Sequence, residues 1–87
     1  MTRIIYTKSF LKSAQKLPRV IQGKLAKQLE FVSENPFNPL LHSKPLVAEL
    51  VGFYSFRITR DWLVVFCFID PEVIKLVDVA HRKDIYK

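Results

Sequence analysis

The sequence predicts a small α+β domain in which a strand and two helices precede three further strands. Two observations carry this prediction. In the first 34 residues, apolar side chains recur every three or four positions, which is the period of a helix. From residue 53 to residue 80, three apolar, β-branched runs are separated by gaps of hairpin length. Because the 87 residues contain no repeat or linker-like tract, we expect residues 1–87 to form one domain with the order β, α, α, β, β, β.

The N-terminal third is predicted to form a strand and a helical hairpin. Ile4–Tyr6 is a short β-prone run, and Thr7 or Ser9 is suited to cap the helix that follows it. Pro18 interrupts this helix and suits the first turn of a second one, which ends before Pro36. The link is so short that the two helices are expected to pack antiparallel, with their lysines outside. Their apolar positions are Phe10, Leu11, Ala14 and Leu17 in the first helix and Val20, Ile21, Leu25, Leu29 and Val32 in the second.

The rest of the chain is predicted to be a loop followed by three strands. Residues 36–51 contain three prolines and no regular period, so they are expected to form a loop that Gly52 closes. The strands are predicted at Phe53–Thr59, Trp62–Ile69 and Val73–Ala80. Because the middle strand is apolar on both faces, we expect it to be central in the sheet and covered by the helices.

Residue types exclude several kinds of site. The single cysteine, Cys67, rules out an intrachain disulfide and a cysteine metal cluster and indicates a reducing compartment. With only Gly23 and Gly52, the chain has no glycine-rich phosphate loop. His42 and His81 lie far apart without a matching carboxylate pattern, so neither a metal nor a cofactor is expected. There is no signal peptide and no membrane-length apolar run, which predicts a cytoplasmic chain.

Charge and apolar content point to a macromolecular partner. Most of the formal charge of +6 lies in residues 1–34, where seven basic residues face two acidic ones, a net of +5. RNA, DNA or an acidic protein is the expected partner, and the alternative is a basic helix face that is merely solvated. Hydrophobic residues make up 49% of the chain, so we also expect exposed apolar surface that another protein covers.

The sharpest chemical cluster is His81, Arg82 and Tyr86, directly after the last predicted strand. A phosphodiester that is attacked by its own 2′-hydroxyl needs a base, a cation and an acid, but no metal. An imidazole moves protons near neutrality, a guanidinium holds a phosphate oxygen, and a phenol donates a proton or stacks. The alternative is an arginine and a tyrosine that finish a C-terminal turn by packing.

A second cation lies on the first of the three strands. Alternation sends Phe56 to one face and both Ser55 and Arg57 to the other. Strand pairing is expected to bring Ser55 and Arg57 beside the end of the last strand, near Arg82. Two cations suit a phosphorane-like transition state, whereas the alternative for Arg57 is an ordinary surface arginine.

The turn between the first two of these strands holds Arg60, Asp61 and Trp62. Trp62 offers a stacking platform for a nucleobase, and Asp61 is a candidate base. The alternative is a plain hairpin turn with a tryptophan that caps the core. In the preceding loop His42 and Lys44 are weaker candidates, and neither supports an assignment alone.

Several segments together resemble the RelE/ParE toxin superfamily, namely residues 52–58, 64–66 and 79–86, with residues 5–12 and 46–52 in support. The resemblance covers nearly the whole chain. It implies a toxin of a type II toxin–antitoxin module, with a helical hairpin packed on a curved antiparallel sheet. RelE-like members are ribosome-dependent endoribonucleases that cut mRNA without a metal, whereas ParE-like members poison DNA gyrase.

The resemblance also implies roles for individual residues. By position, Arg57 falls where RelE-like enzymes place a basic residue on the second strand. Arg82 matches their phosphate-binding arginine after the last strand, and Tyr86 matches their C-terminal tyrosine. Asp61 resembles the catalytic aspartate that begins the third strand in the YafQ-like branch, and His81 lies near that branch's C-terminal histidine. The further residues expected to contact RNA are Ser55, Arg60, Trp62 and Lys83.

We therefore predict a cytoplasmic toxin that cleaves mRNA on the ribosome and thereby inhibits translation. Its expected partner is an antitoxin that presents an acidic, amphipathic helix. The alternatives are a ParE-like gyrase inhibitor and a degenerate module that only binds its antitoxin. Ser55 and Trp62 stand where many relatives carry basic residues, which favours the degenerate module.

Overall fold

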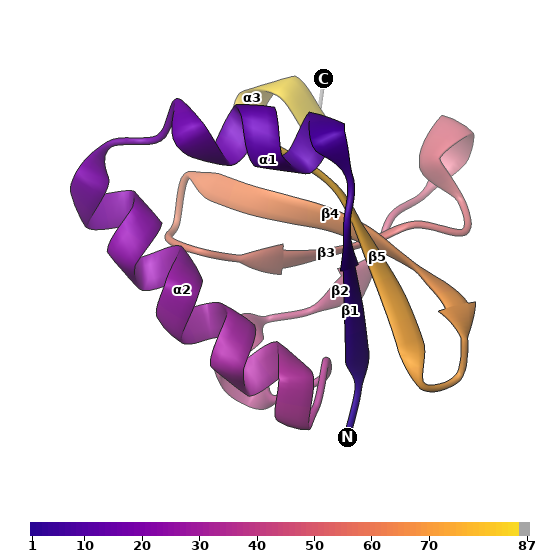
Figure 1. The fold of residues 1–87 in the computed structure, drawn as a ribbon. Coiled ribbons are helices and arrows are strands. Elements are labelled where there is room, and N and C mark those ends of the chain that lie inside the picture. Colours follow the sequence, from indigo (N-terminus) through magenta and orange to yellow (C-terminus); the bar gives the residue numbers. More distant parts are fainter. Residues whose placement is uncertain (86–87) are drawn as a thin grey trace.

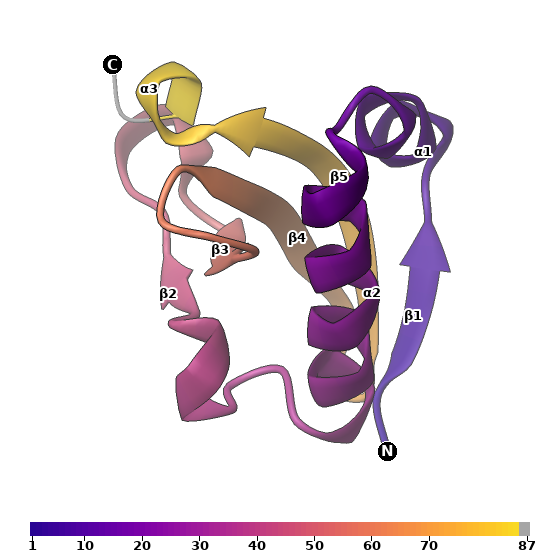
Figure 2. The ribbon, with the colours of Figure 1, turned by 90° about the vertical axis from the view of Figure 1, so that its left-hand side faces the viewer.

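Two helices pack on one face of a five-stranded sheet in the computed structural model, which describes residues 1–85 (Figure 1). In spatial order the strands are β1 (Arg3–Tyr6), β5 (Val73–His81), β4 (Trp62–Asp70), β3 (Tyr54–Arg57) and β2 (Lys44–Pro45). The helices are α1 (Lys8–Gln15) and α2 (Arg19–Glu34). In Figure 2, α2 stands in front of the sheet, with β1 and α1 to one side of it and β2, β3 and α3 to the other. None of the helices in residues 1–85 has the length and apolar content needed to cross a membrane.

The predicted α+β fold and its order of elements are confirmed, and four short elements are added. Within the predicted loop the chain forms β2 and two 3₁₀ turns, η1 (Pro39–Leu41) and η2 (Ala48–Leu50). A last helical turn, α3 (Arg82–Ile85), follows β5. These elements are two to four residues long, which is too short to show a hydrophobic period.

The sheet is antiparallel from β2 to β5, as expected, but β1 pairs parallel with β5. A parallel neighbour requires a crossover, and α1 and α2 provide the return path. The Thr2 N–H donates to the Ser33 carbonyl at 2.8 Å, so the end of α2 lies beside the start of β1.

Side-chain hydrogen bonds hold the start of α1 and its junction with α2. Of the two predicted caps for α1, Thr7 is the one used, since its hydroxyl accepts the Phe10 N–H at 3.1 Å. The same hydroxyl donates to the Leu76 carbonyl at 2.8 Å and so ties the helix to β5. At the other end, the Gln22 side-chain amide donates to the Gln15 carbonyl at 3.1 Å, which links the start of α2 to the end of α1.

The main core lies between the helices and the facing side of the sheet. Phe56 and Ile58, in the strand predicted at Phe53–Thr59, are buried in this core. Arg57 between them is exposed, which confirms the predicted alternation. On the opposite face Leu63 and Val65 are also buried, so the central strand β4 is enclosed on both sides although α1 and α2 cover only one. The core cluster comprises Phe10, Leu17, Leu25, Val32, Leu41, Phe56, Ile58, Val64, Phe66, Ile74, Leu76 and Val79.

A β-bulge changes the face that β5 presents near its end. Val65 pairs with Asp78 and Phe66 pairs with Leu76, which leaves Val77 as an extra residue in β5. Before the bulge Leu76 points into the core, and after it Val79 does so. The alternation along β5 is therefore shifted by one residue just before the strand reaches His81.

Candidate functional site

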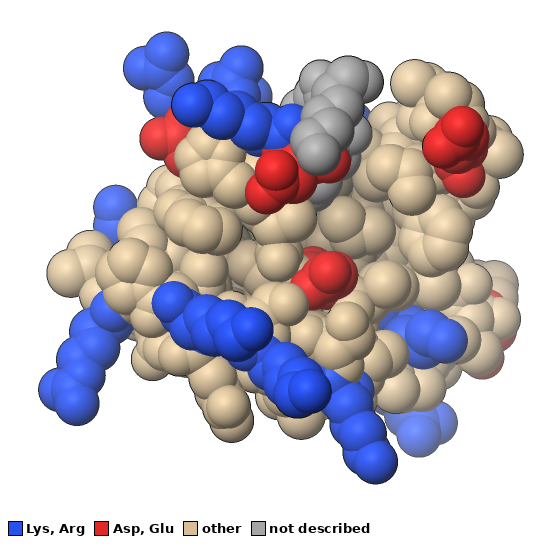
Figure 3. All heavy atoms as spheres, turned by 90° about the horizontal axis from the view of Figure 1, so that it is seen from above, with Lys and Arg blue, Asp and Glu red and all other residues tan. Residues whose placement is uncertain are grey.

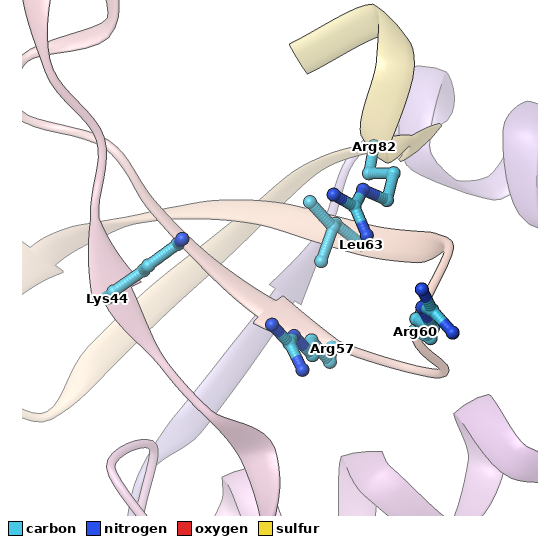
Figure 4. Close-up of a pocket in the computed structure, with 5 residues that line it drawn as sticks. All are labelled: Lys44, Arg57, Arg60, Leu63 and Arg82. Atoms are coloured by element: carbon cyan, nitrogen blue, oxygen red, sulfur yellow. The ribbon is translucent and has the colours of Figure 1, made fainter. Parts of the chain in front are cut away.

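A basic cleft of about 220 Å3 opens on the face of the sheet opposite the helices. Its lining in the described part of the chain consists of Lys44, Arg57, Arg60, Leu63 and Arg82. The basic residues come from four segments: β2, the end of β3, the β3–β4 turn and the start of α3. Figure 4 shows their side chains gathered around Leu63 of β4. We call this group the basic cleft.

Strand register explains why these residues converge. Lys44 pairs with Ser55, and Arg57 pairs with Leu63 on the neighbouring strand. Directly opposed residues share a face, and so do residues two positions apart on one strand. Lys44, Ser55, Arg57 and Leu63 must therefore point to the same side of the sheet.

Backbone hydrogen bonds hold the turn and α3 at the rim of the cleft. The Arg82 N–H donates to the Asp61 carbonyl at 2.8 Å, so the start of α3 lies against the β3–β4 turn. The turn itself is closed by the Ile58 N–H, which donates to the Trp62 carbonyl at 2.9 Å. From the helix layer, Gln28 donates to the Arg57 carbonyl at 2.9 Å. These hydrogen bonds thus fix the backbone of Arg57, of the turn that carries Arg60, and of Arg82.

The electrostatics of the cleft favour an anion. No carboxylate is among its lining residues in the described chain, so the charges of Lys44, Arg57, Arg60 and Arg82 add to one positive field. Arginine side chains bind phosphate oxygens through a planar pair of donors. A compact anion such as a phosphodiester group therefore fits both the size and the sign of the cleft.

Basic residues also extend over the neighbouring surface. Seen from the end that carries α1 and α3, Lys and Arg side chains ring much of the outline of the molecule, and acidic side chains are fewer (Figure 3). On α1 and its C-cap, Lys8, Lys12 and Lys16 are exposed at a spacing of four residues, which places them on one side of the helix. The predicted basic helix face is thus present.

The structure separates His81 from the cleft. His81 pairs with Trp62 across β4 and β5, and Trp62 packs against the core cluster on the helix side of the sheet. Leu63, the next residue, points to the cleft side. His81 is accordingly absent from the lining, whereas Arg82 is present.

His81 instead serves as the cap of α3. Its Nδ1 accepts the Lys83 N–H at 3.2 Å. A histidine at this position satisfies a backbone donor of the first turn in the way that Asn or Asp does in other helices. The ring therefore has a structural task that the sequence did not reveal.

The other predicted residues lie around the cleft without lining it. Ser55 is only 1% exposed and is held within the sheet on the cleft side. Asp61 is exposed in the turn, next to Arg60 of the lining, and Lys83 is exposed on α3. Tyr86 lies outside the described residues.

Lys44 lines the cleft, although the sequence made it only a weak candidate for a site residue. It occurs in a proline-bracketed loop with no period, and its two-residue strand β2 is recognised only through its pairing with Ser55 and Tyr54. The available signal was the run Lys44-Pro45-Leu46 shortly before Gly52, since an edge strand tolerates a proline.

Residues 4–86 match the family model described as the ParE toxin of type II toxin–antitoxin system, parDE. A search of curated protein sequences finds no match.

Several solved structures share the fold. YafQ from E. coli strain BL21(DE3) superposes with a TM-score of 0.79 at 14% identity, with both chains covered in full. The YoeB/ParE toxin from Agrobacterium tumefaciens gives a TM-score of 0.76 at 18% identity, covering 93% of this chain and 99% of that one. A chain of the toxin–antitoxin complex RelBE2 from Mycobacterium tuberculosis gives 0.67 at 28% identity, covering 93% and 98%.

The family model and the shared fold together place the chain in the RelE/ParE superfamily of small toxins. Since the family model matches nearly the whole sequence, the chain belongs to the ParE toxin family of type II toxin–antitoxin systems. The resemblance seen in the sequence is thereby confirmed.

Proposed function

We propose that this toxin is a metal-independent endoribonuclease that cleaves mRNA on the ribosome in the cytoplasm. The observation that carries the proposal is the basic cleft, in which Lys44, Arg57, Arg60 and Arg82 surround a space of about 220 Å3. A cleft lined by cations attracts a phosphodiester and repels a divalent cation, so the charge stabilisation has to come from the protein.

The proposed reaction is attack of a ribose 2′-oxygen on the adjacent phosphorus. The bond between phosphorus and the 2′-oxygen forms, and the bond between phosphorus and the 5′-oxygen breaks. A base takes the proton of the 2′-hydroxyl, and an acid returns a proton to the leaving 5′-oxygen. Negative charge builds on the nonbridging oxygens, where the guanidinium groups of Arg57 and Arg82 stabilise it.

Asp61 is our preferred base, with His81 as the alternative. The hydrogen bond between the Arg82 N–H and the Asp61 carbonyl places Asp61 beside a cleft residue. His81 already uses Nδ1 to accept the Lys83 N–H and packs its ring against Trp62. For the acid, Lys44 lines the cleft as an ammonium donor, and Tyr86 and His81 are the candidates from the sequence.

Mapping of mRNA ends in cells tests this function. Induction of the chain should produce new cuts inside translated reading frames, and Arg82→Ala or Arg57→Ala should lower cleavage by about 10²- to 10³-fold, the effect of removing one transition-state donor. Arg19→Ala is the matched control, because Arg19 is an exposed arginine at the start of α2, outside the lining. Equal cleavage by a folded Arg82→Ala variant would contradict the proposal.

A gyrase inhibitor is the second candidate, because the matching family model is that of ParE toxins. This candidate predicts growth arrest with intact mRNA, DNA damage in the cell and loss of supercoiling by purified gyrase. A third candidate, a degenerate module that only binds its antitoxin, predicts neither effect. Ser55 is buried and Trp62 packs on the core, which argues against contact between these two residues and RNA. This observation favours the third candidate.

An antitoxin partner completes the proposal. The RelBE2 structure is of a toxin–antitoxin complex, and the DinJ–YafQ and YoeB–YefM structures are complexes as well. On this chain Leu11 is exposed on α1 together with Lys8 and Lys12, and Val20 is exposed at the start of α2. Exposed apolar and basic side chains together suit an acidic, amphipathic helix. Purification with the product of the adjacent gene should yield a stable complex in which cleavage is suppressed.

A further inference from the structure

Two hydroxyl groups from α1 and its N-cap hold the bulge in β5. The Thr7 hydroxyl shares its hydrogen between the Leu76 carbonyl at 2.8 Å and the Val77 carbonyl at 3.1 Å. The Ser13 hydroxyl of α1 donates to Oδ1 of Asp78 at 2.5 Å, a usual length for a hydroxyl that donates to a carboxylate. The three consecutive residues of the bulge are therefore each bonded to α1 or its cap.

The carboxylate of Asp78 joins α1 to the strand just after the bulge. The oxygen that accepts the Ser13 hydroxyl also accepts the Val79 N–H at 2.8 Å. Val79 is the first residue after the bulge whose side chain returns to the core. One partly buried carboxylate oxygen thus fixes both the helix and the direction in which β5 continues.

The bulge decides which residue of β5 reaches the β3–β4 turn. Trp62 pairs with His81, and the next N–H, that of Arg82, donates to the Asp61 carbonyl at 2.8 Å. Without the extra residue the pairing would slip by one position, so that Ala80 would stand opposite Trp62. Arg82 would then lose its place against the turn. Bulges beside active sites re-aim side chains in this way, and Figure 2 shows β5 passing α1 before it reaches α3.

We propose that Ser13 and Asp78 are positioning residues, which hold the bulge and thereby bring Arg82 into the basic cleft. The described lining of the cleft contains neither residue, so both act through the backbone of β5. The inference rests on the proposed function for its effect on RNA cleavage. Its effect on the backbone of Arg82 is independent of that function.

Hydrogen exchange at single amides tests the positioning without depending on toxicity. Asp78→Ala and Ser13→Ala should speed exchange of the Arg82 amide by about tenfold, the effect of about one lost hydrogen bond. The Arg3 amide, which donates to the Glu72 carbonyl at the other end of β5, should exchange as in the wild type. NMR of the full-length chain measures both amides.

Two further variants serve as controls. Asp78→Asn keeps an oxygen that can accept both hydrogen bonds, so it should behave like the wild type. Ser9→Ala removes an exposed hydroxyl from the same helix and should leave both amides unchanged. Ser13→Ala removes only one oxygen atom, so the test stands even if Asp78→Ala does not fold.

Kinetics of mRNA cleavage on purified ribosomes give a second readout. Asp78→Ala should lower kcat by up to about 10²-fold, the cost of a displacement of about 1 Å at the reacting centre. KM should change little, because Lys44, Arg57 and Arg60 still line the cleft. Asp78→Asn should restore kcat, which a merely destabilising substitution would not explain.

The opposite results overturn the inference. Unchanged exchange at Arg82 in folded Ser13→Ala, or an equal rise at Arg3 and Arg82, would show that the two residues do not position the end of β5. An effect of Asp78→Asn as large as that of Asp78→Ala would show that the hydrogen bonds are not the cause. A local rise at Arg82 together with a wild-type chain that cleaves no RNA would uphold the positioning and remove the ribonuclease.

Discussion

Trp62 and His81 stand directly opposite each other on β4 and β5, with ring centroids 5.2 Å apart and ring planes at 79°. The pair lies on the helix side of the sheet, one residue from Leu63 and Arg82 of the basic cleft on the other side. The contact fixes the imidazole so that its Nδ1 meets the Lys83 N–H. His81 therefore contacts the start of α3 and does not line the cleft.

This arrangement predicts that the hydrogen-bond acceptor of His81 matters more than its ability to move a proton. His81→Asn keeps an acceptor for the Lys83 N–H and should retain cleavage, whereas His81→Leu should lose about 1 kcal/mol of stability together with the geometry of Arg82. Urea unfolding and cleavage of mRNA in cells give the two readouts. If a folded His81→Asn variant lost cleavage as completely as Arg82→Ala, His81 would instead belong to the chemistry.

The basic cleft predicts how RNA binding depends on salt. Lys44→Ala should weaken binding of a short single-stranded RNA and should lower the slope of log affinity against log salt concentration by about 0.7, as expected for one lost phosphate contact. Fluorescence anisotropy titrations at several salt concentrations measure both quantities. Arg19→Ala is the control, and an unchanged slope for Lys44→Ala would remove Lys44 from the site.

The cap of α1 predicts a difference between two neighbouring hydroxyl residues. The Thr7 hydroxyl accepts the Phe10 N–H and donates to the Leu76 carbonyl, so Thr7→Ala should cost about 1–2 kcal/mol of stability. Thr7→Ser keeps the hydroxyl and should cost much less. Ser9→Ala, inside the helix and exposed, should be close to neutral in the same denaturation experiment, and a cost equal to that of Thr7→Ala would contradict the assignment of the cap.

Backbone conformation around η2 predicts substitutions of opposite sign. Ala48 has φ of 58° and Gly52 has φ of 94°, both in the region that disfavours a side chain. Ala48→Gly should raise stability by about 1 kcal/mol, and Gly52→Ala should lower it by about 1–2 kcal/mol. Because no atom lies within 4 Å of a Cβ placed at Gly52, a loss there would report backbone strain rather than a clash. Thermal melting of both variants measures the two shifts, and shifts of the same sign would refute this account.

Local patterns in the sequence determined the elements and their burial. The helical spacing of Phe10, Leu25 and Val32 and the alternation around Arg57 depend only on residue type and the geometry of one element, so they could be read without the fold. The sequence also predicts that strand pairing brings Ser55 and Arg57 beside the end of the last strand, which is wrong because β4 lies between β3 and β5. Arg57 and Arg82 nevertheless both line the basic cleft.

Pairing between distant segments decided the rest of the site. Lys44 reaches the cleft only because a two-residue strand pairs with β3, and two residues carry no period that a sequence reveals. Likewise, simple alternation from Leu76 would place His81 on the cleft side, but the extra residue at Val77 shifts the alternation and turns His81 toward Trp62. A bulge depends on how two strands fit across the sheet, so the face on which His81 lies is a property of the tertiary structure. The sequence alone determined only which residue types follow β5, not the face of the sheet to which each one points.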